Sequence, residues 1–256
     1  MGYSANVVKG VSWMSGFRIL TRALSFLKII VLARALTPSQ FGIFGIATLV
    51  LALLEMLTET GINIILIQSK NEIDKYINSA WVVSIIRGIF ISLIIIISTP
   101  FITSFFNTPN VSGILLLIST VPFIRGFINP SEIKFQKDLK FHYEFWFRTA
   151  IFAFDAMVAI IFVTLTHSVY SLVWGLMAGA LLEVALSFIL VRPLPGLHIN
   201  KNYFNEIFHK GKWVTAYGIF NYVAQKGDSL TVGKVMGVAS LGIYEMAYSI
   251  STLPIS

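Results

Sequence analysis

Eight long apolar segments follow one another along the chain, and they restrict its fold more than any other feature. They cover residues 11–33, 42–67, 79–99, 112–129, 147–166, 169–191, 213–236, and 241 to the end. A helix needs about 20 mostly apolar residues to cross a bilayer, whereas a membrane β-strand needs about 9–11 that alternate. Backbone in lipid must also satisfy its own hydrogen bonds. We therefore expect an all-α integral membrane protein, a polytopic helical bundle whose eighth helix is unfinished at Ser256.

Composition excludes several classes of protein and of site. Hydrophobic residues make up 56% of the chain and charged residues 12%, against about 45–50% and about 25% in soluble domains. There is no cysteine, and the four histidines lack the spacing of metal ligands. No phosphate-binding P-loop occurs. We therefore predict no catalytic residues, no metal and no cofactor, and we do not expect an enzyme.

The net charge of +7 does not point to nucleic acid, because the basic residues are spread between the apolar segments. The connections between these segments alternate between the two sides of the membrane, and the basic residues gather on one side. The connections 1–10, 68–78, 131–146 and 192–212 are basic, whereas the opposite set, 34–41, 100–111, 167–168 and 237–240, holds only Arg34. Basic connections stay in the cytoplasm, so we expect a cytoplasmic N-terminus. Anionic lipid headgroups or a phosphorylated substrate fit this charge as partners.

The segment from Ser131 to Arg148 mixes lysines, carboxylates and aromatic residues at near-helical spacing. One interpretation is an amphipathic helix on the inner membrane surface, with its aromatic rings at headgroup depth. The other is a solvated loop that carries an aromatic belt.

A weak internal repeat at an offset of 200 residues divides the chain. Residues 34–47 align with 234–247, and the identical or similar pairs are Arg34 with Lys234, Gly42 with Gly242, Ile43 with Ile243, Phe44 with Tyr244, and Ala47 with Ala247. Parallel repeats in membrane proteins build two halves around a central path. We expect a first bundle of six helices over 1–195, and the start of a second, helix seven and part of helix eight, over 196–256.

Ionisable residues inside the predicted helices are the candidates for function, because each costs about 2.5–3.5 kcal/mol in the membrane on insertion scales. On the first helix, one face at the 3.6-residue repeat carries Arg18, Thr21, Arg22 and Ser25, with Lys28 at its flank. The second helix has a similar stripe of Thr48, Glu55, Thr58 and Glu59. Because the helices run antiparallel, Arg22 falls level with Glu55, and Arg18 with Glu59.

Two interpretations of these stripes stay open. The opposite charges neutralise each other between packed helices, or they line a water-filled cavity whose cations receive an anion. Arg87 on the third helix and Arg125 on the fourth leave the inner half net positive. This surplus favours phosphate, because guanidinium groups bind phosphate oxygens bidentately.

Further charges lie on later helices. Asp155 and Glu183 are single carboxylates that can each pair with Arg148 or with another nearby arginine. The seventh helix brings polar side chains to one face, namely Asn221, Gln225 and Asp228, with Lys226 beside them. Asp228 either holds Lys226 or carries a coupling proton or cation.

Several stretches together resemble the polysaccharide transporter (Wzx-type flippase) family, within the superfamily of multidrug and oligosaccharidyl-lipid exporters. They are KGVSW at 9–13, ARALTPSQFGIFGIA at 33–47, ETGINIILIQ at 59–68, FQKDLKF at 135–141, FHKGKW at 208–213 and GDSLTVGKVMGVASLGIYEMA at 227–247. They occur in order from end to end. The chain departs from the family in length, because the second bundle ends after about one and a half helices.

The resemblance implies a two-lobed exporter fold, here with its second lobe truncated, in the bacterial inner membrane. It implies that undecaprenyl-diphosphate-linked oligosaccharides are moved outward by alternating access, for the synthesis of lipopolysaccharide, capsule or exopolysaccharide. It also implies a polysaccharide polymerase and chain-length machinery as partners. We expect the pyrophosphate to meet Arg18, Arg22, Lys28 and Arg87. The cavity would be shaped by Glu55, Glu59, Asn221 and Gln225. Ion coupling or charge pairing would fall to Asp228, Lys226 and Asp155.

Three rival functions are weaker. A cation-coupled drug exporter of the same fold would prefer a negative cavity, because its drugs are cationic. A membrane-embedded glycan polymerase or ligase would need a large outer loop with catalytic residues, and the outer connections are short. A purely structural subunit would not explain polar stripes at matching depths.

Overall fold

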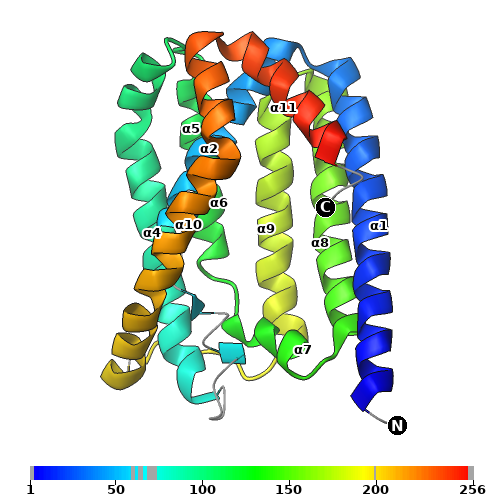
Figure 1. Cartoon of the computed structure of the whole chain (residues 1–256), viewed down its shortest axis with the longest axis vertical. Coiled ribbons are helices and arrows are strands. Elements are labelled where there is room, and N and C mark those ends of the chain that lie inside the picture. The colour runs from blue at the N-terminus through cyan, green and yellow to red at the C-terminus, as the bar shows by residue number, and fades with distance from the viewer. Residues whose placement is uncertain (1–2, 59–60, 63–65, 68–73, 199, 253–256) are drawn as a thin grey trace.

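The computed structural model describes residues 3–58, 61–62, 66–67, 74–198 and 200–252. Within these ranges the chain is built of helices (Figure 1). Their bounds are α1 Tyr3–Ala35, α2 Pro38–Leu57, α4 Asp74–Phe105, α5 Val111–Ile118, α6 Thr120–Arg125, the 3-10 helix η1 Pro130–Ile133, α7 Lys134–Lys137, α8 Phe141–Thr166, α9 Tyr170–Leu190, α10 Lys201–Val235 and α11 Val238–Thr252.

The long helices run roughly along one axis (Figure 1). We call the end where α1 and α10 begin the basal end, and the end where α2 and α11 begin the apical end. Helix α8 packs against both α1 and α9, so these three helices form one row. Helix α4 packs against α5, α6 and α10, while α11 crosses α2 at the apical end. The all-α membrane fold predicted from the apolar segments is confirmed.

Not every predicted span has equal support. Among the described residues, Pro38–Leu57, Tyr76–Phe105, Phe141–Thr166 and Tyr170–Leu190 are long and apolar enough to cross a membrane. The fourth predicted span, 112–129, is not one straight helix. Its helical part, Val111–Arg125, meets the following segment, Pro130–Lys137, at an angle of 69°. Counted together as one span, these two segments would make a fifth crossing. Charges such as Arg18 and Arg22 interrupt α1, and α11 has only 15 residues.

The observed structure of segment 131–148 matches neither of the two interpretations of its sequence. Its first part forms η1 and α7, which are short turns of helix. From Phe141 onward the chain already belongs to α8 and continues to Thr166. A surface helix over the whole segment is therefore wrong. The positive φ of 55° at Leu139 and the break before Phe141 redirect the chain into the long helix.

The repeat reappears in the helix boundaries. Helix α1 ends at 35 and α2 begins at 38, while α10 ends at 235 and α11 begins at 238. Helix α2 starts with a capping box, in which the Thr37 hydroxyl accepts from the Gln40 backbone N–H and the Gln40 side chain accepts from that of Thr37. The offset of 200 residues thus marks two equivalent helix–turn–helix units.

These equivalent units meet in a reciprocal contact. A Cβ atom on Gly42 would lie 1.8 Å from the Val238 carbonyl oxygen, and one on Gly242 would lie 1.9 Å from the Pro38 carbonyl oxygen. Residues 38 and 238, like 42 and 242, are repeat partners, so the crossing has local two-fold symmetry. Only glycine lets the two backbones approach this closely.

The core lies between α2, α5 and α9, toward the apical half. Ile46, Leu115 and Val173 are fully buried there. A smaller basal cluster joins the start of α4 to η1 through residues such as Ile77 and Ile133. Outside these two clusters, charged side chains of α2, α4, α6, α8 and α9 contact one another through ion pairs and hydrogen bonds.

We predict that Gly42→Ala destabilises the α2–α11 crossing. The added methyl group overlaps the Val238 carbonyl, and overpacking of this kind costs about 1–3 kcal/mol. The matched control is Gly227→Ala on α10, because a Cβ there meets no atom within 4 Å and alanine favours the helix. Thermal unfolding in detergent should show a lower Tm for Gly42→Ala only. Equal Tm values for the two variants would contradict the crossing.

Candidate functional site

Two cavities meet at Arg125, the last residue of α6. The first has a volume of about 210 Å³ and is lined from α2, α4, α6 and η1. Its polar lining consists of Glu55, Ser84, Arg87, Arg125 and Glu132. The second has a volume of about 200 Å³ and is lined from α1, α6, α8 and α9. Its charged lining consists of Arg125, Arg148, Asp155 and Glu183.

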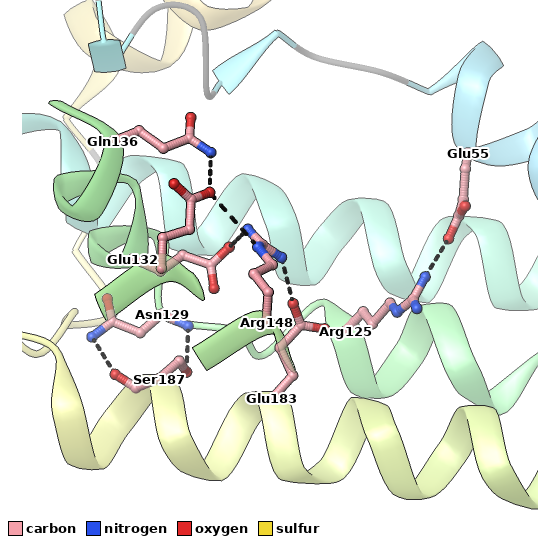
Figure 2. A network of polar contacts seen from close by, with 9 residues as sticks. Glu55, Arg125, Asn129, Glu132, Gln136, Arg148, Glu183 and Ser187 are labelled. Atoms are coloured by element: carbon pink, nitrogen blue, oxygen red, sulfur yellow. Dashed lines mark hydrogen bonds and ion pairs between the residues drawn. The ribbon is translucent and has the colours of Figure 1, made fainter. Parts of the chain in front are cut away.

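Arg125 itself is held by one carboxylate. Its Nη1 lies 3.5 Å from Oε1 of Glu55, and the two side chains keep 41% and 34% of their surface exposed (Figure 2). An exposed pair at this distance contributes little stability, typically about 0.2–1 kcal/mol. The Arg125 guanidinium can therefore exchange its partner for another anion at small cost.

Arg87 is fixed more firmly than the sequence predicts. Its Nη2 donates to the Glu55 carbonyl oxygen at 2.7 Å, and its Nε donates to the Thr58 hydroxyl at 3.1 Å. Because these acceptors lie at the carboxyl end of α2, the cation also meets the negative end of the helix dipole. Arg87 thus ties α4 to α2 and lines the first cavity at the same time.

Lys28 and Asp155 pair with each other across α1 and α8. Lys28 Nζ lies 2.9 and 3.1 Å from the two oxygens of Asp155, and the side chains are only 16% and 12% exposed. Helix α9 closes over the pair at Gly175, where a Cβ would lie 2.6 Å from Asp155 Oδ1. The predicted partnership of Asp155 with Arg148 is therefore wrong. Lys28 is engaged by this carboxylate, which competes with its predicted contact to pyrophosphate.

Arg148 gathers three carboxylates at the basal end of the second cavity (Figure 2). Its Nη2 lies 3.2 Å from Glu132, its Nη1 3.1 Å from Glu183, and its Nε 4.0 Å from Glu144. The pairing with Glu183 was predicted. Glu132 and Glu144 were missed, although the spacing of four residues between Glu144 and Arg148 is a recognisable helical pair.

The turn before η1 is fastened to α9 close to this network (Figure 2). The backbone N–H of Asn129 donates to the Ser187 hydroxyl at 3.1 Å, and its side-chain amide donates to the Ser187 and Pro193 carbonyls at 3.4 and 3.2 Å. Asn129 and Ser187 are fully buried. These bonds fix the bend between α6 and α7, and hence the position of Glu132.

Of the two interpretations left open for the charged stripes, mutual neutralisation of α1 and α2 does not occur among the described residues. Helix α1 packs mainly on α8, and Arg125 rather than Arg22 contacts Glu55. Within the part of the chain that the structure describes, the guanidinium groups of Arg18 and Arg22 make no hydrogen bond or ion pair. Glu59 lies outside the described residues.

The polar residues of α10 form a separate group beside α11. The Gln225 amide donates to Asn221 at 2.8 Å, so these two share a face as predicted. Lys226 pairs with Glu245 at 3.5 Å and lies over the Tyr248 ring, while Asp228 accepts a hydrogen bond from Tyr244. Of the two roles left open for Asp228, the pairing with Lys226 is replaced by these contacts, and ion coupling stays a prediction. This group lines neither cavity at Arg125.

The chemistry available at Arg125 is anion binding. Across the described ranges, no group of three histidine or acidic residues is placed to hold a metal ion. Arg125 stands between two cavities with a weak carboxylate partner, and a guanidinium group presents paired donors to phosphate oxygens. A phosphate or diphosphate therefore suits this position.

Comparison with known proteins finds one matching family and several related bacterial proteins. The family model described as "Polysaccharide biosynthesis protein" matches residues 31–256. The chain is 22% identical to the lipopolysaccharide biosynthesis protein WzxC of Escherichia coli, covering 99% of this chain and 52% of that protein. It is 22% identical to an uncharacterized membrane protein in the cps region of Klebsiella pneumoniae, covering 99% and 53%.

A third relative is named as a transport protein. The succinoglycan biosynthesis transport protein ExoT of Rhizobium meliloti is 19% identical, covering 97% of this chain and 50% of that protein. The chain thus spans about half the length of these curated relatives. No solved structure matches it.

We predict that the Lys28–Asp155 pair stabilises the α1–α8 packing. Asp155→Ala leaves a buried lysine without its partner, which costs about 3–5 kcal/mol when a buried pair is broken. The reversed pair Lys28→Asp with Asp155→Lys should recover part of the lost stability. A double-mutant cycle on thermal unfolding measures this coupling. Additive effects of the two single reversals would show that the pair contributes nothing.

Proposed function

This chain belongs to the polysaccharide biosynthesis protein family, and from that premise we propose that it forms part of a flippase for lipid-linked oligosaccharides. The substrate is an oligosaccharide on a polyprenyl diphosphate, carried across the inner membrane for lipopolysaccharide, capsule or exopolysaccharide. The names of WzxC and ExoT support this class of substrate. A polysaccharide polymerase and chain-length machinery are the partners expected beside such a flippase.

The single observation that carries the proposal is the position of Arg125 between two cavities. The diphosphate displaces Glu55 from the Arg125 guanidinium and forms a bidentate contact there. The guanidinium groups of Arg18 and Arg22, which lack partners among the described residues, add positive charge from α1. The mixed charges of the cavities keep the site hydrated, so the polar substrate does not meet hydrocarbon.

The charges of the connections and the α2–α11 crossing support an orientation of the chain in the membrane. We propose that the basal end is cytoplasmic, because the basic connections lie there. Gly42 lies at the start of α2 and Glu55 thirteen residues later, a rise of about 20 Å along a helix. The α2–α11 crossing therefore lies on the apical side of the Arg125 cavities, where it blocks exit from that side.

We further propose that 1–195 forms one bundle and 196–256 opens a second. The reciprocal contact of Gly42 and Gly242 supports this division, because it relates α2 to α11 by local two-fold symmetry. Outward release then requires α11 to move away from α2. If α10 moves with α11, the hydrogen bond from the Tyr222 hydroxyl on α10 to the Leu49 carbonyl on α2, at 2.6 Å, also breaks.

Binding of undecaprenyl diphosphate to the purified chain in detergent tests the proposal. Arg125→Ala should weaken binding by at least about tenfold, in line with the about 1.5–3 kcal/mol of a charged hydrogen bond. Arg125→Lys should recover part of the affinity, since it restores the charge without the bidentate geometry. The control is Arg34→Ala, an exposed apical residue outside both cavities. Unchanged affinity in Arg125→Ala would refute the site.

A further inference from the structure

A third, smaller cavity lies between α1 and the start of α8. It has a volume of about 120 Å³ and is lined by Trp13, Phe17, Phe141, Glu144, Phe145 and Arg148. Four of these six side chains are aromatic, whereas the cavities at Arg125 are lined mainly by aliphatic and charged residues. The small volume restricts an occupant to about one ring, since drug-sized pockets measure about 300–1,000 Å³.

The aromatic rings form walls that a ligand can reach. The Trp13 ring lies 5.1 Å from that of Phe145, and Phe17 meets Phe145 edge-on at 6.3 Å. Trp13 remains 39% exposed. The faces of these rings carry partial negative charge, and they attract the positively polarised C–H groups of a ligand.

Glu144 supplies a hydrogen-bond acceptor that nothing in the described chain uses. Its Oε1 accepts from the Gln136 amide at 2.6 Å. Its Oε2 is buried and has no hydrogen-bond partner. A buried acceptor without a donor costs about 1–3 kcal/mol, and more when it is charged. A rotation of the Glu144 side chain toward the cavity would bring Oε2 within reach of a ligand hydroxyl group, and that bond would remove this penalty.

The electrostatics of the cavity disfavour an anion. Arg148 directs its Nη atoms at Glu132 and Glu183, so its positive charge is already engaged. Three carboxylates surround this one guanidinium, counting Glu144. A phosphate group would meet net negative charge here, in contrast to its surroundings at Arg125. The cavity therefore suits a neutral ligand rich in hydroxyl groups.

We propose that this cavity binds one sugar ring of the glycan substrate. A pyranose presents a face of C–H groups to the aromatic walls and hydroxyl groups to Glu144. A prenyl chain would fit the walls but would leave Glu144 Oε2 without a donor, which is unfavourable. Phe17 and Arg148 also line the second cavity, which extends to Arg125. The link between sugar and diphosphate rests on the proposed function, but binding of the sugar itself does not.

Saturation-transfer NMR on the purified full chain in detergent tests this site. The probes are the methyl glycosides of glucose, galactose and N-acetylglucosamine, and farnesyl diphosphate as the prenyl and diphosphate probe. At least one glycoside should receive saturation on the C–H protons of one ring face. Trp13→Leu should reduce that signal at least fivefold, and Glu144→Gln, which replaces an acceptor oxygen by a donor, should also reduce it. Trp174→Ala, on α9 against Phe162, is the control and should retain the signal.

The outcomes separate this inference from the proposed function. Arg125→Ala should lose farnesyl diphosphate binding and keep the glycoside signal, while Trp13→Leu should do the reverse. The inference is overturned if no glycoside binds the wild-type chain, or if Trp13→Leu and Trp174→Ala reduce the signal equally. It is also overturned if the prenyl protons, rather than the sugar protons, lose saturation in Trp13→Leu.

Discussion

The cost of placing charge inside an apolar bundle governs this structure more than any other constraint. Arg87 on α4 and Arg148 on α8 each contact an oxygen on a different helix. Breaking such a contact leaves a charge in low dielectric, so the pairs decide which helices lie together. Lys28 and Asp155 place α1 against α8 in this way. The exception is Arg125, whose contact with Glu55 is long and half-exposed, and this is where an external anion can enter.

The α2–α11 crossing at Gly42 and Gly242 holds the apical end of the molecule together. Polar pairs hold the basal half together through long side chains, which tolerate hydration and exchange of partners. At the apical end, α2 and α11 touch through backbone at Gly42 and Gly242, and no side chain separates them. A backbone contact of this kind excludes water, yet it contains no ion pair that would resist separation. The molecule thus combines a basal half held by ion pairs with an apical contact made by backbone.

The sequence predicts the helices well because the apolar runs leave the backbone no other way to satisfy its hydrogen bonds. It also locates the repeat, since Arg34 and Lys234 end equivalent helices that are followed by equivalent turns. The sequence does not predict which helices and which charged side chains contact each other. The spacing of Arg18 and Arg22 gives a face and a depth, but not the neighbouring helix, and α1 lies against α8 rather than α2. The break after Ile118 and the bend at η1 were likewise missed. That bend depends on Asn129 reaching Ser187, 58 residues away in sequence.

A structure of the chain with undecaprenyl diphosphate bound would show directly whether Arg125 holds the anion. We expect phosphate oxygens within hydrogen-bonding distance of the Arg125 guanidinium, with Glu55 turned away and the Lys28–Asp155 pair intact. Phosphates held by Arg18 and Arg22 alone, with Arg125 still on Glu55, would contradict it and move the anion site to α1.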